Sequence, residues 1–456
     1  MNAKKSLVLF CLSVFLLQNG FAQEVLRFSL EEAVKYALEN NINVKNAQLE
    51  HQASDNEIGE ILSIGLPQVN ASAGLTDNVI LPKTIIDISS FPGSTVPEGT
   101  TEEVTFATQY SAFMDITVEQ MVFDASYFIG LKAAKTLKEL TYRDLELSRI
   151  DASEMVTKAY YTALINSERL ELFNRQLGTT DTLLQETRIM NENGFAEKID
   201  VSRIQVQYNN LKVEKNRFER LSDLSLDLLK FQMGIPISQP IELTENLESI
   251  TFTETTYDLA TFDYSNRLEF SQIQTREKLQ EINVKNIRTG YYPNLHAFAS
   301  LGANSGSQNF GRATSLDFGG TNRAWFESAA IGLNLNIPIF DSFKKSNQIQ
   351  KVQVKLEQID NQREQLKSNI DLEILQARND LNTAGENLDI QKENLELAKE
   401  IYDVSKIKYQ EGVGSNIEVI NATTTYKESE INYYNALYDA LIAKVDLEKA
   451  LGTLID

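Results

Sequence analysis

The stretch NIPIFDSFKKSNQIQ, residues 336–350, begins as one kind of structure and ends as another. Up to Phe340 its apolar residues alternate as they do in a β-strand, and after Asp341 the sequence becomes polar and rich in helix-forming residues. No proline follows Pro338. The stretch EQMVFDASYFIGLK, residues 119–132, makes the same change. Both stretches predict a strand that continues directly into a long helix.

The positions of the prolines show where the long helices lie. All eight prolines fall outside residues 98–235 and 339–456, and glycine is sparse in these two stretches. Both stretches are rich in Glu, Lys, Gln, Leu and Ala, which favour the α-helix. A helix rises about 1.5 Å per residue, so about 70 residues span roughly 100 Å. The sequence therefore predicts rods that no compact globular core would need.

The chain contains two copies of one plan. The sequence GFAEKIDVSRIQVQYNNLKVEKNR from Gly194 aligns with GVGSNIEVINATTTYKESEINYYN from Gly412 at a constant offset of 218 residues. Further upstream, the residues around Pro67 match those around Pro293. Each copy predicts a leading helix, two strands joined by a loop rich in small polar residues, a long helix, a turn at glycine and a returning helix. A duplicated unit of this kind decides how the whole chain is divided.

The duplication sets the expected boundaries. We assign the first repeat to residues 23–234, with strands at about 66–76 and 105–123 and long helices at about 125–232. A linker follows at 235–264. We assign the second repeat to residues 265–456, with strands at about 291–303 and 324–340 and long helices at about 342–452. In the first repeat, Ser29 and Glu32 have the spacing of a capping box.

The N-terminal residues predict export. Lys4 and Lys5 precede an apolar run that is too short to span a bilayer. This pattern indicates a secretory signal peptide over residues 1–22, cut after Ala22. The chain's one cysteine, Cys11, lies inside the apolar run, so we expect no disulfide and no thiol chemistry in the mature chain.

The charge and the motifs exclude several classes of function. The formal net charge of −21 argues against a nucleic-acid partner, which would require a basic surface. After residue 22 no apolar run is long enough for a transmembrane helix. The sequence lacks the motifs of serine hydrolases, phosphate loops and zinc proteases, and neither His51 nor His296 lies in a metal-ligand cluster. We therefore expect no enzyme, no catalytic residue, no metal and no cofactor.

The long helices carry a repeat of 3.5 residues, which is the spacing of a coiled-coil seam. In the second repeat the seam consists of Ile370, Ile374, Ala377, Leu381, Ala384, Leu388, Gln391, Leu395, Ala398, Tyr402, Ser405, Tyr409, Ala422, Tyr426, Ser429, Tyr433, Ala436, Ala440, Ala443 and Leu447. In the first repeat the pattern is looser, through Ile204, Tyr208, Leu211 and Phe218. Taken alone, this spacing also fits a soluble periplasmic coiled-coil scaffold.

The strands favour a membrane protein over that alternative. Each has one apolar and one polar parity over about ten residues, which is the length that a tilted strand needs to cross a bilayer. A soluble sheet with one wet face shows the same alternation. However, the long helices predict rods rather than a cover for the apolar face. Four strands in lipid would leave two unpaired edges, so copies of the chain must close one barrel together.

With these elements in place, the sequence resembles the TolC family of outer membrane efflux channels. The matching residues are SLEEAVKYALENN at 29–41, LPQV at 66–69, YYPNL at 291–295, IPIFD at 337–341 and YQEGVGSNIEVINATTTY at 409–426. The motifs are short, but the duplicated order of elements covers nearly the whole mature chain.

The resemblance implies the fold class and the partners. It implies a mainly α protein with membrane β: a homotrimer with a shared 12-stranded outer membrane β-barrel and a long periplasmic α-helical barrel. The segment 235–264 and the C-terminus would form a collar. Such channels are the passive exit ducts of tripartite efflux pumps and type I secretion systems in the outer membrane of Gram-negative cells. They dock to a periplasmic adaptor (membrane fusion) protein, which links them to an inner-membrane transporter of the resistance-nodulation-division or ABC type.

The resemblance also implies a gate near the ends of the helical hairpins, where acidic residues ring a constriction. The matching positions are Glu418 and Asn421, and Asp200 is the first-repeat counterpart of Glu418. Asn421 departs from the family's pattern of two acids, so the gate would carry less charge. A local role is equally open for Glu418, because Ser415 and Glu418 have the spacing of a capping box.

The turns between the long helices are implied to be adaptor-docking tips. They contain Gly194 and Phe195 in the first repeat and Val413, Gly414 and Ser415 in the second. Gly194 and Gly412 would also end their helices whatever their partners are, because glycine is the usual residue just beyond a helix C-terminus.

Overall fold

The structure of the chain is a computed structural model that describes residues 25–93, 95–245, 262–319 and 324–454. The predicted signal peptide and Ala22 lie outside the described residues, as does most of the predicted linker. The chain divides into two compact units. A helical unit contains residues up to 52, residues 140–274 and residues from 360 onward, and a sheet unit contains residues 53–139 and 275–359. The long helices α4 (Ala125–Glu192) and α8 (Lys344–Gln410) contribute to both.

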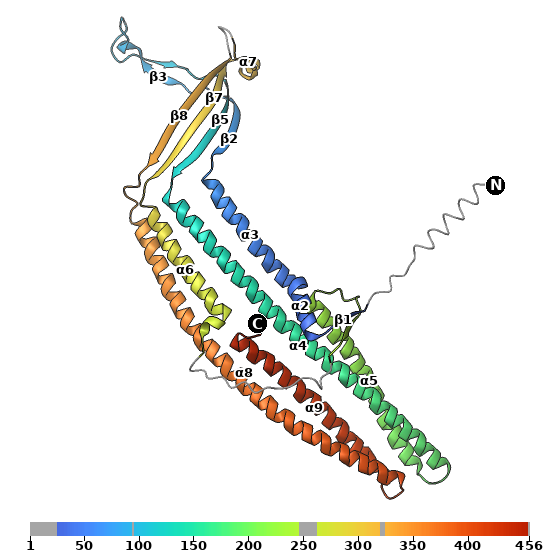
Figure 1. Ribbon diagram of the computed structural model, residues 1–456. Helices are drawn as coiled ribbons and strands as arrows, with labels where there is room; N and C mark the ends of the chain where they lie inside the picture. The colour runs from blue at the N-terminus through green and yellow to red at the C-terminus, as the bar shows by residue number, and fades with distance from the viewer. Residues whose placement is uncertain (1–24, 94, 246–261, 320–323, 455–456) are drawn as a thin grey trace, which may run out of the picture. The chain divides into compact units, whose positions relative to one another are not determined.

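The sheet unit is built on four antiparallel strands (Figure 1). They are β2 (Gln68–Asp77), β5 (Tyr110–Phe123), β7 (Asn294–Ser307) and β8 (Trp325–Asn336), in the order β2-β5-β7-β8. The ends of the strands differ from the predicted bounds for local reasons. β8 ends before Pro338, which has no N–H for the ladder. β5 begins at Tyr110 rather than at 105, because Tyr110 pairs with Asp77, the last residue of β2.

The register aligns residues into rows across all four strands. Directly opposed residues share a face of the sheet, so each row belongs to one face. One row of the apolar face consists of Val69, Val118, Ala299 and Ile331. One row of the polar face consists of Ser72, Asp115, Gly302 and Ser328. The alternation predicted for each strand therefore produces one apolar and one polar face in the assembled sheet.

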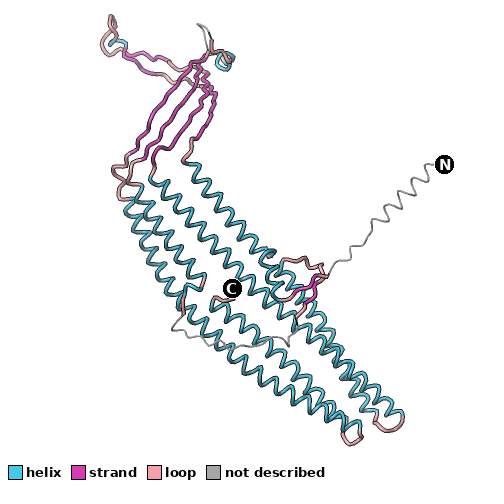
Figure 2. The backbone as a smooth tube through the Cα atoms, viewed as in Figure 1, coloured by secondary structure: helices cyan, strands magenta, loops and turns pink. Residues whose placement is uncertain are grey.

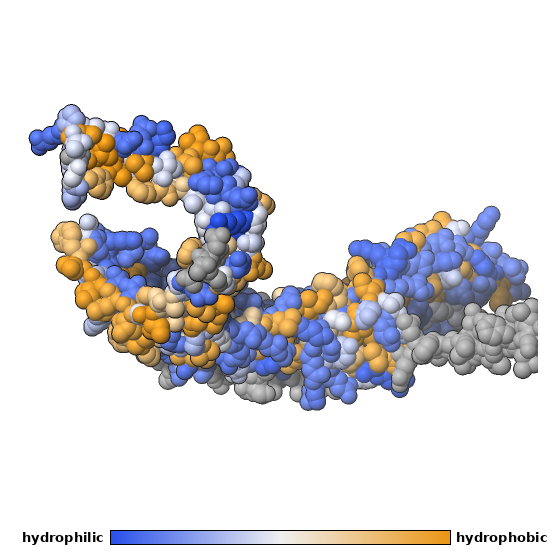
Figure 3. Space-filling model, turned by 90° about the horizontal axis from the view of Figure 1, so that it is seen from above, coloured by the Kyte–Doolittle hydropathy of each residue, from blue (hydrophilic) through white to orange (hydrophobic). Residues whose placement is uncertain are grey.

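The apolar face of the sheet is open in the single chain. Ile331 is 91% exposed and Leu333 is 70% exposed. Figure 3 shows hydrophobic residues gathered on the convex side of the curved sheet. β2 and β8 form the two edges of the sheet, each with one paired and one unpaired side. In lipid, unpaired strand edges carry a large cost because no water can satisfy their backbone groups.

The joint between β8 and α8 is strained. Ser342 and Phe343 have positive φ angles of 55° and 64°, which cost a residue with a side chain about 1–2 kcal/mol each. Asp341 holds the joint, because its carboxylate accepts from the Lys345 backbone N–H at 3.0 Å and pairs with the Lys345 ammonium at 3.0 Å. The helix therefore begins at Lys344 rather than at 342 as predicted.

Several elements of the sheet unit were not predicted. The chain between β2 and β5 forms a hairpin of β3 (Thr84–Asp87) and β4 (Thr101–Val104), with a short 3-10 helix, η1 (Ile88–Ser90), after β3. A short helix, α7 (Phe310–Thr314), lies between β7 and β8. The leading helices α3 (Ile42–Ile64) and α6 (Leu268–Thr289) also contribute residues to this unit.

The helical unit contains two long hairpins, shown in cyan in Figure 2. In the first, α4 is followed by α5 (Lys198–Met233), and in the second, α8 is followed by α9 (Asn416–Leu451). The smaller elements are β1 (Leu26–Phe28), α2 (Leu30–Asn40), β6 (Ile241–Leu243) and η4 (Tyr264–Asn266), and β1 pairs in parallel with β6. The predicted capping box is present, since the Ser29 backbone N–H donates to the Glu32 carboxylate at 2.9 Å.

The predicted seam is the packed face of the second hairpin. All twenty seam residues from Ile370 to Leu447 are buried or half-buried. At one end, Ile370 and Ile374 of α8 pack in one core cluster with Leu447 and Leu451 of α9. In the first hairpin, Ile204 and Leu211 are also buried. The coiled-coil prediction is therefore confirmed for the residues that carried it.

The two returning helices end in the same way. Gly234 after α5 and Gly452 after α9 have left-handed φ angles of 77° and 76°. Gly234 packs against Asn40, the last residue of α2, and a Cβ on Gly234 would lie 2.5 Å from the Asn40 carbonyl oxygen. Gly452 packs against Asn266, shortly before α6, and a Cβ on Gly452 would meet the carbonyl of Asn266. The duplication in the sequence is thus repeated in how each helix end is docked.

Candidate functional site

The tips of the two hairpins have one backbone geometry. At the first, Gly194 has a φ of 79° and the Phe195 N–H donates to the Met190 carbonyl at 2.8 Å. At the second, Gly412 has a φ of 74° and the Val413 N–H donates to the Lys408 carbonyl at 2.9 Å. Both are Schellman turns, which satisfy the last carbonyls of a helix and require a left-handed residue.

Each tip displays one large apolar side chain. Phe195 is 80% exposed and Val413 is 79% exposed. The second tip is tighter, because a Cβ on Gly414 would lie 2.9 Å from the Cβ of Lys408. Ser415 caps α9, and its hydroxyl accepts from the Glu418 N–H at 3.3 Å. The five residues predicted as adaptor-docking tips thus lie at two exposed turns.

The predicted gate residues lie on the first turns of the returning helices. Asp200 is half-buried and engaged locally, since its carboxylate accepts from the Glu197 N–H at 3.3 Å and pairs with Arg203 at 3.6 Å. The carboxylate of Glu418 is exposed, and the bond to Ser415 uses only the backbone N–H of Glu418. Asn421, one turn further along α9, is also exposed.

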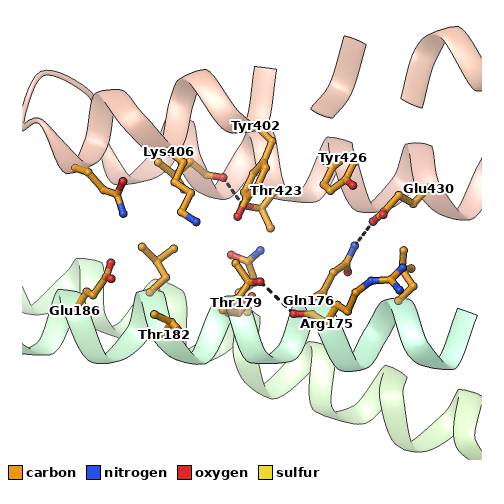
Figure 4. Close-up of a pocket in the computed structure, with 16 residues that line it drawn as sticks. Arg175, Gln176, Thr179, Thr182, Glu186, Tyr402, Lys406, Thr423, Tyr426 and Glu430 are labelled. Atoms are coloured by element: carbon orange, nitrogen blue, oxygen red, sulfur yellow. Dashed lines mark hydrogen bonds between the residues drawn. The ribbon is translucent and has the colours of Figure 1, made fainter. Parts of the chain in front are cut away.

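A cavity of about 350 Å³, lined mostly by polar residues, lies between the two hairpins (Figure 4). All four long helices of the helical unit line it. Its lining includes Gln176 and Glu186 of α4, Gln207 of α5, Tyr402 and Lys406 of α8, and Tyr426 and Glu430 of α9. No pattern in the sequence predicts this cavity.

Glu430 is the most unusual group in the cavity. Only 9% of the residue is exposed, yet it carries a carboxyl group. Its Oε2 atom accepts from the Gln176 Nε2 at 2.7 Å, and this bond joins α9 to α4 (Figure 4). Burial raises the pKa of Glu430 above its usual value, while hydrogen bonds from Tyr426 and Gln176 and the charges of Arg175 and Lys399 act in the opposite direction.

Residues close to Glu430 are held in place by contacts of their own. The rings of Tyr402 and Tyr426 stack with centroids 5.5 Å apart and 15° between their planes. Arg175 pairs with Glu171 one turn earlier on α4, at 2.8 Å. The Oε1 atom of Gln176 is buried and has no hydrogen-bond partner among the residues that the structure describes. The amide of Gln176 therefore uses its donor toward Glu430 and leaves its acceptor unused.

One signal in the sequence could have pointed to Glu430. It lies four residues after the seam residue Tyr426 and one after Ser429, so it borders the packed face of α9. A charged residue beside a seam is usually solvated, and the sequence does not show that a second hairpin covers this one. Only the packing of α4 against α9 makes the position a buried one.

Among the residues that the structure describes, no group of three His, Cys, Asp or Glu side chains is placed to hold a metal ion. No helix in the described ranges combines the length and the hydropathy needed to cross a membrane.

The comparisons with known proteins agree on one family. A sequence model described as "Outer membrane efflux protein" matches residues 264–453. The chain is 20% identical to the outer membrane protein TolC of Salmonella enteritidis over 96% of this chain and 84% of that protein. It is 23% identical to a probable efflux pump outer membrane protein, TtgC, of Pseudomonas putida over 77% of this chain and 71% of that protein.

The chain is similar to outer membrane efflux proteins over most of its length. Solved structures of similar fold include the open state of the MtrE outer membrane channel of Neisseria gonorrhoeae, with a TM-score of 0.69, 16% identity and coverage of 93% of this chain and 89% of that one. Another is the outer membrane protein VceC of Vibrio cholerae, with a TM-score of 0.64, 14% identity and coverage of 93% and 96%. The predicted fold class, mainly α with membrane β, is confirmed.

The similarity to outer membrane proteins places the chain in the outer membrane with its helical part in the periplasm, as the sequence predicted. The similar proteins are efflux channel proteins and not enzymes, in agreement with the prediction for this chain.

Proposed function

We propose that this outer membrane efflux protein is the exit duct of a tripartite efflux pump, formed as a passive, gated homotrimer. The observation that carries the proposal is the four-stranded sheet, which has an exposed apolar face, a polar face and two open edges. In lipid such a sheet is complete only when β2 of one copy meets β8 of the next. Three copies would close a barrel of about twelve strands, wide enough to hold water.

The long helices support assembly from several copies. Exposed apolar residues recur every seven positions on α5, at Ile199, Val206 and Val213, which are 51%, 59% and 66% exposed. A second stripe follows α8 at Ile390, Leu397 and Val404, which are 56%, 51% and 45% exposed. Such spacing is typical of a helix face that packs against another helix. Neighbouring copies would cover these stripes and extend the barrel as a helical wall.

The partners follow from the proposed role. Similar proteins of Pseudomonas putida are named as outer membrane components of toluene and antibiotic efflux pumps. A passive duct needs an energised inner-membrane transporter, of the resistance-nodulation-division or ABC type, reached through a periplasmic adaptor. Type I secretion would use the same arrangement. We assign adaptor docking to the exposed tips at Phe195 and Val413 and to the adjoining Gly194, Gly414 and Ser415.

The gate would act through a shift between closed and open tips. A partner opens the duct only as far as it binds open tips better than closed ones. We propose that Glu418, Asn421 and Asp200 line the constriction. Glu418 is the residue best placed for this role, because its carboxylate is exposed whereas that of Asp200 is bonded within its own helix. A soluble periplasmic scaffold, the alternative reading, leaves the apolar sheet face without a purpose.

The gate proposal predicts a result for Glu418→Ala in planar lipid bilayers. Rings of acidic side chains favour cations, so removing three carboxylates should lower the cation-to-anion permeability ratio roughly twofold or more and raise the resting conductance. The matched control is Glu428→Ala, which removes an exposed acid elsewhere on the same helix and should leave both quantities unchanged. Conductance and ion preference identical to those of the native protein would remove Glu418 from the gate.

A further inference from the structure

We propose that Glu430 and Gln176 form a proton-dependent latch between the two helical hairpins, which holds them together when Glu430 is protonated. The proposal deepens the gating part of the proposed function and rests on it for its biological role. Glu430 is buried, the Gln176 amide nitrogen donates to it across the two hairpins, and the Oε1 atom of Gln176 has no partner among the described residues.

The two residues join separate hairpins. Gln176 lies on α4, in the hairpin α4–α5, and Glu430 lies on α9, in the hairpin α8–α9. Their bond of 2.7 Å crosses the edge of the polar cavity (Figure 4). Any separation of the hairpins at this level must break the bond and admit water to the carboxyl group of Glu430.

Protonation of Glu430 would add a hydrogen-bond donor beside the unpaired Oε1 atom of Gln176. The buried Oε1 atom of Gln176 has no partner in the described part of the chain, and it belongs to the same amide whose nitrogen donates to Glu430. An ionised carboxylate can only accept, so it cannot satisfy this oxygen. A protonated carboxyl group adds one O–H donor. The pair would then hold two bonds, one in each direction, and both buried groups would be satisfied.

The charged neighbours come from all the helices around the carboxyl group. Arg175 on α4 and Lys399 on α8 favour the ionised form of Glu430, and Tyr426 on α9 donates a hydrogen bond to it. Tyr434 on α9 also interacts with Glu430. The contribution of α5 to the cavity is Gln207, which does not titrate. Burial outweighs these effects and raises the pKa of Glu430.

The sign of the pH dependence follows. A Glu430 that is hydrated in separated hairpins would have an ordinary pKa, and the packed state raises it, so the packed state binds the proton more tightly. The added stability of the latch is complete below the ordinary pKa and is lost as the pH rises through the raised pKa. Each unit between the two values changes the ratio of packed to separated hairpins tenfold. Acid should therefore close the hairpins.

The test measures the distance between hairpins directly. The only cysteine in the sequence, Cys11, lies in the predicted signal peptide, so Asp181→Cys on α4 and Glu428→Cys on α9 can carry two spin labels at exposed positions. Labelled chain is assembled with an excess of unlabelled chain, so that only distances within one copy are seen. Lowering the pH from about 7.5 to about 5 should reduce the long-distance population roughly threefold or more.

Three variants of the doubly labelled protein decide the outcome. Glu430→Gln supplies a permanent N–H donor, so its hairpins should stay packed at both pH values. Gln176→Leu removes the bond between the hairpins and should leave a larger long-distance population at pH 5 than the parent protein shows. Glu396→Gln, an exposed acid on α8, should respond as the parent protein does. A parent protein without an acid response, or a response that persists in Glu430→Gln, overturns the latch. Whether the native protein forms a conducting channel in lipid bilayers tests the proposed function separately, because that result does not depend on the pH response of the hairpins.

Discussion

The substitution Leu333→Arg is expected to prevent stable insertion of the protein into lipid vesicles. Leu333 lies on the apolar face of β8, is 70% exposed and pairs with Ala297 of β7. An arginine on the lipid-facing side of a membrane strand costs about 2–4 kcal/mol near the middle of the bilayer. In a homotrimer every copy carries the charge, so the cost is paid three times per assembly. Folding into vesicles, titrated with urea, measures the loss.

The neighbouring residue supplies the control for that experiment. Asn334 follows Leu333 on the same strand and pairs with His296, so its side chain lies on the opposite, polar face. The variant Asn334→Arg should insert almost as well as the native protein, because its charge would face water. If both variants insert equally well, or if Asn334→Arg is the worse of the two, the apolar face does not face lipid.

The substitution Gly234→Ala should destabilise the helical unit by about 2–4 kcal/mol. About 1–2 kcal/mol comes from the left-handed φ of 77°, and the rest comes from the new methyl group, which would lie 2.5 Å from the backbone oxygen of Asn40. Backbone cannot move aside as a flexible side chain can. Gly452→Ala should behave in the same way, since its docking repeats that of Gly234. Chemical unfolding in detergent measures both.

Two further glycines separate the two contributions. Gly194 also has a left-handed φ, 79°, but its Cβ would meet nothing within 4 Å, so Gly194→Ala should show only the backbone cost of about 1–2 kcal/mol. Gly178 lies inside α4 in open space, and Gly178→Ala should stabilise the helix by about 0.5–1 kcal/mol. Equal losses at Gly234 and Gly194 would show that the contact with Asn40 contributes nothing.

The sequence was sufficient for the four long strands, the long helices and the turns between them, although not for the short elements β3, β4 and α7. Strands were predicted from alternation, the seam from Ile370 to Leu447 from its repeat of 3.5 residues, and the turns from Gly194 and Gly412. These signals work because side-chain direction repeats every two residues in a strand and about every 3.6 in a helix. The bounds failed where backbone chemistry intervened, as at Pro338, which ends β8, and at the left-handed Ser342 and Phe343, which delay α8.

Features that depend on contacts between distant segments could not be predicted. Nothing in the local sequence around Leu26 or Ile241 indicates that β1 and β6 pair. The docking of Gly234 on Asn40 joins residues far apart in the chain, as does the bond between Gln176 and Glu430. Local contacts of a predicted site residue were also missed. The carboxylate of the predicted gate residue Asp200 accepts from the Glu197 N–H and pairs with Arg203.

The number of chains in the purified particle is the most direct test of the account. The sheet has open edges at β2 and β8. In lipid these edges can be satisfied only when β2 of one copy pairs with β8 of the next. Native mass spectrometry of the protein released from detergent gives the mass without assumptions about shape. A homotrimer gives a particle of three chains of equal mass that persists on dilution. A stable particle of a single chain would contradict it.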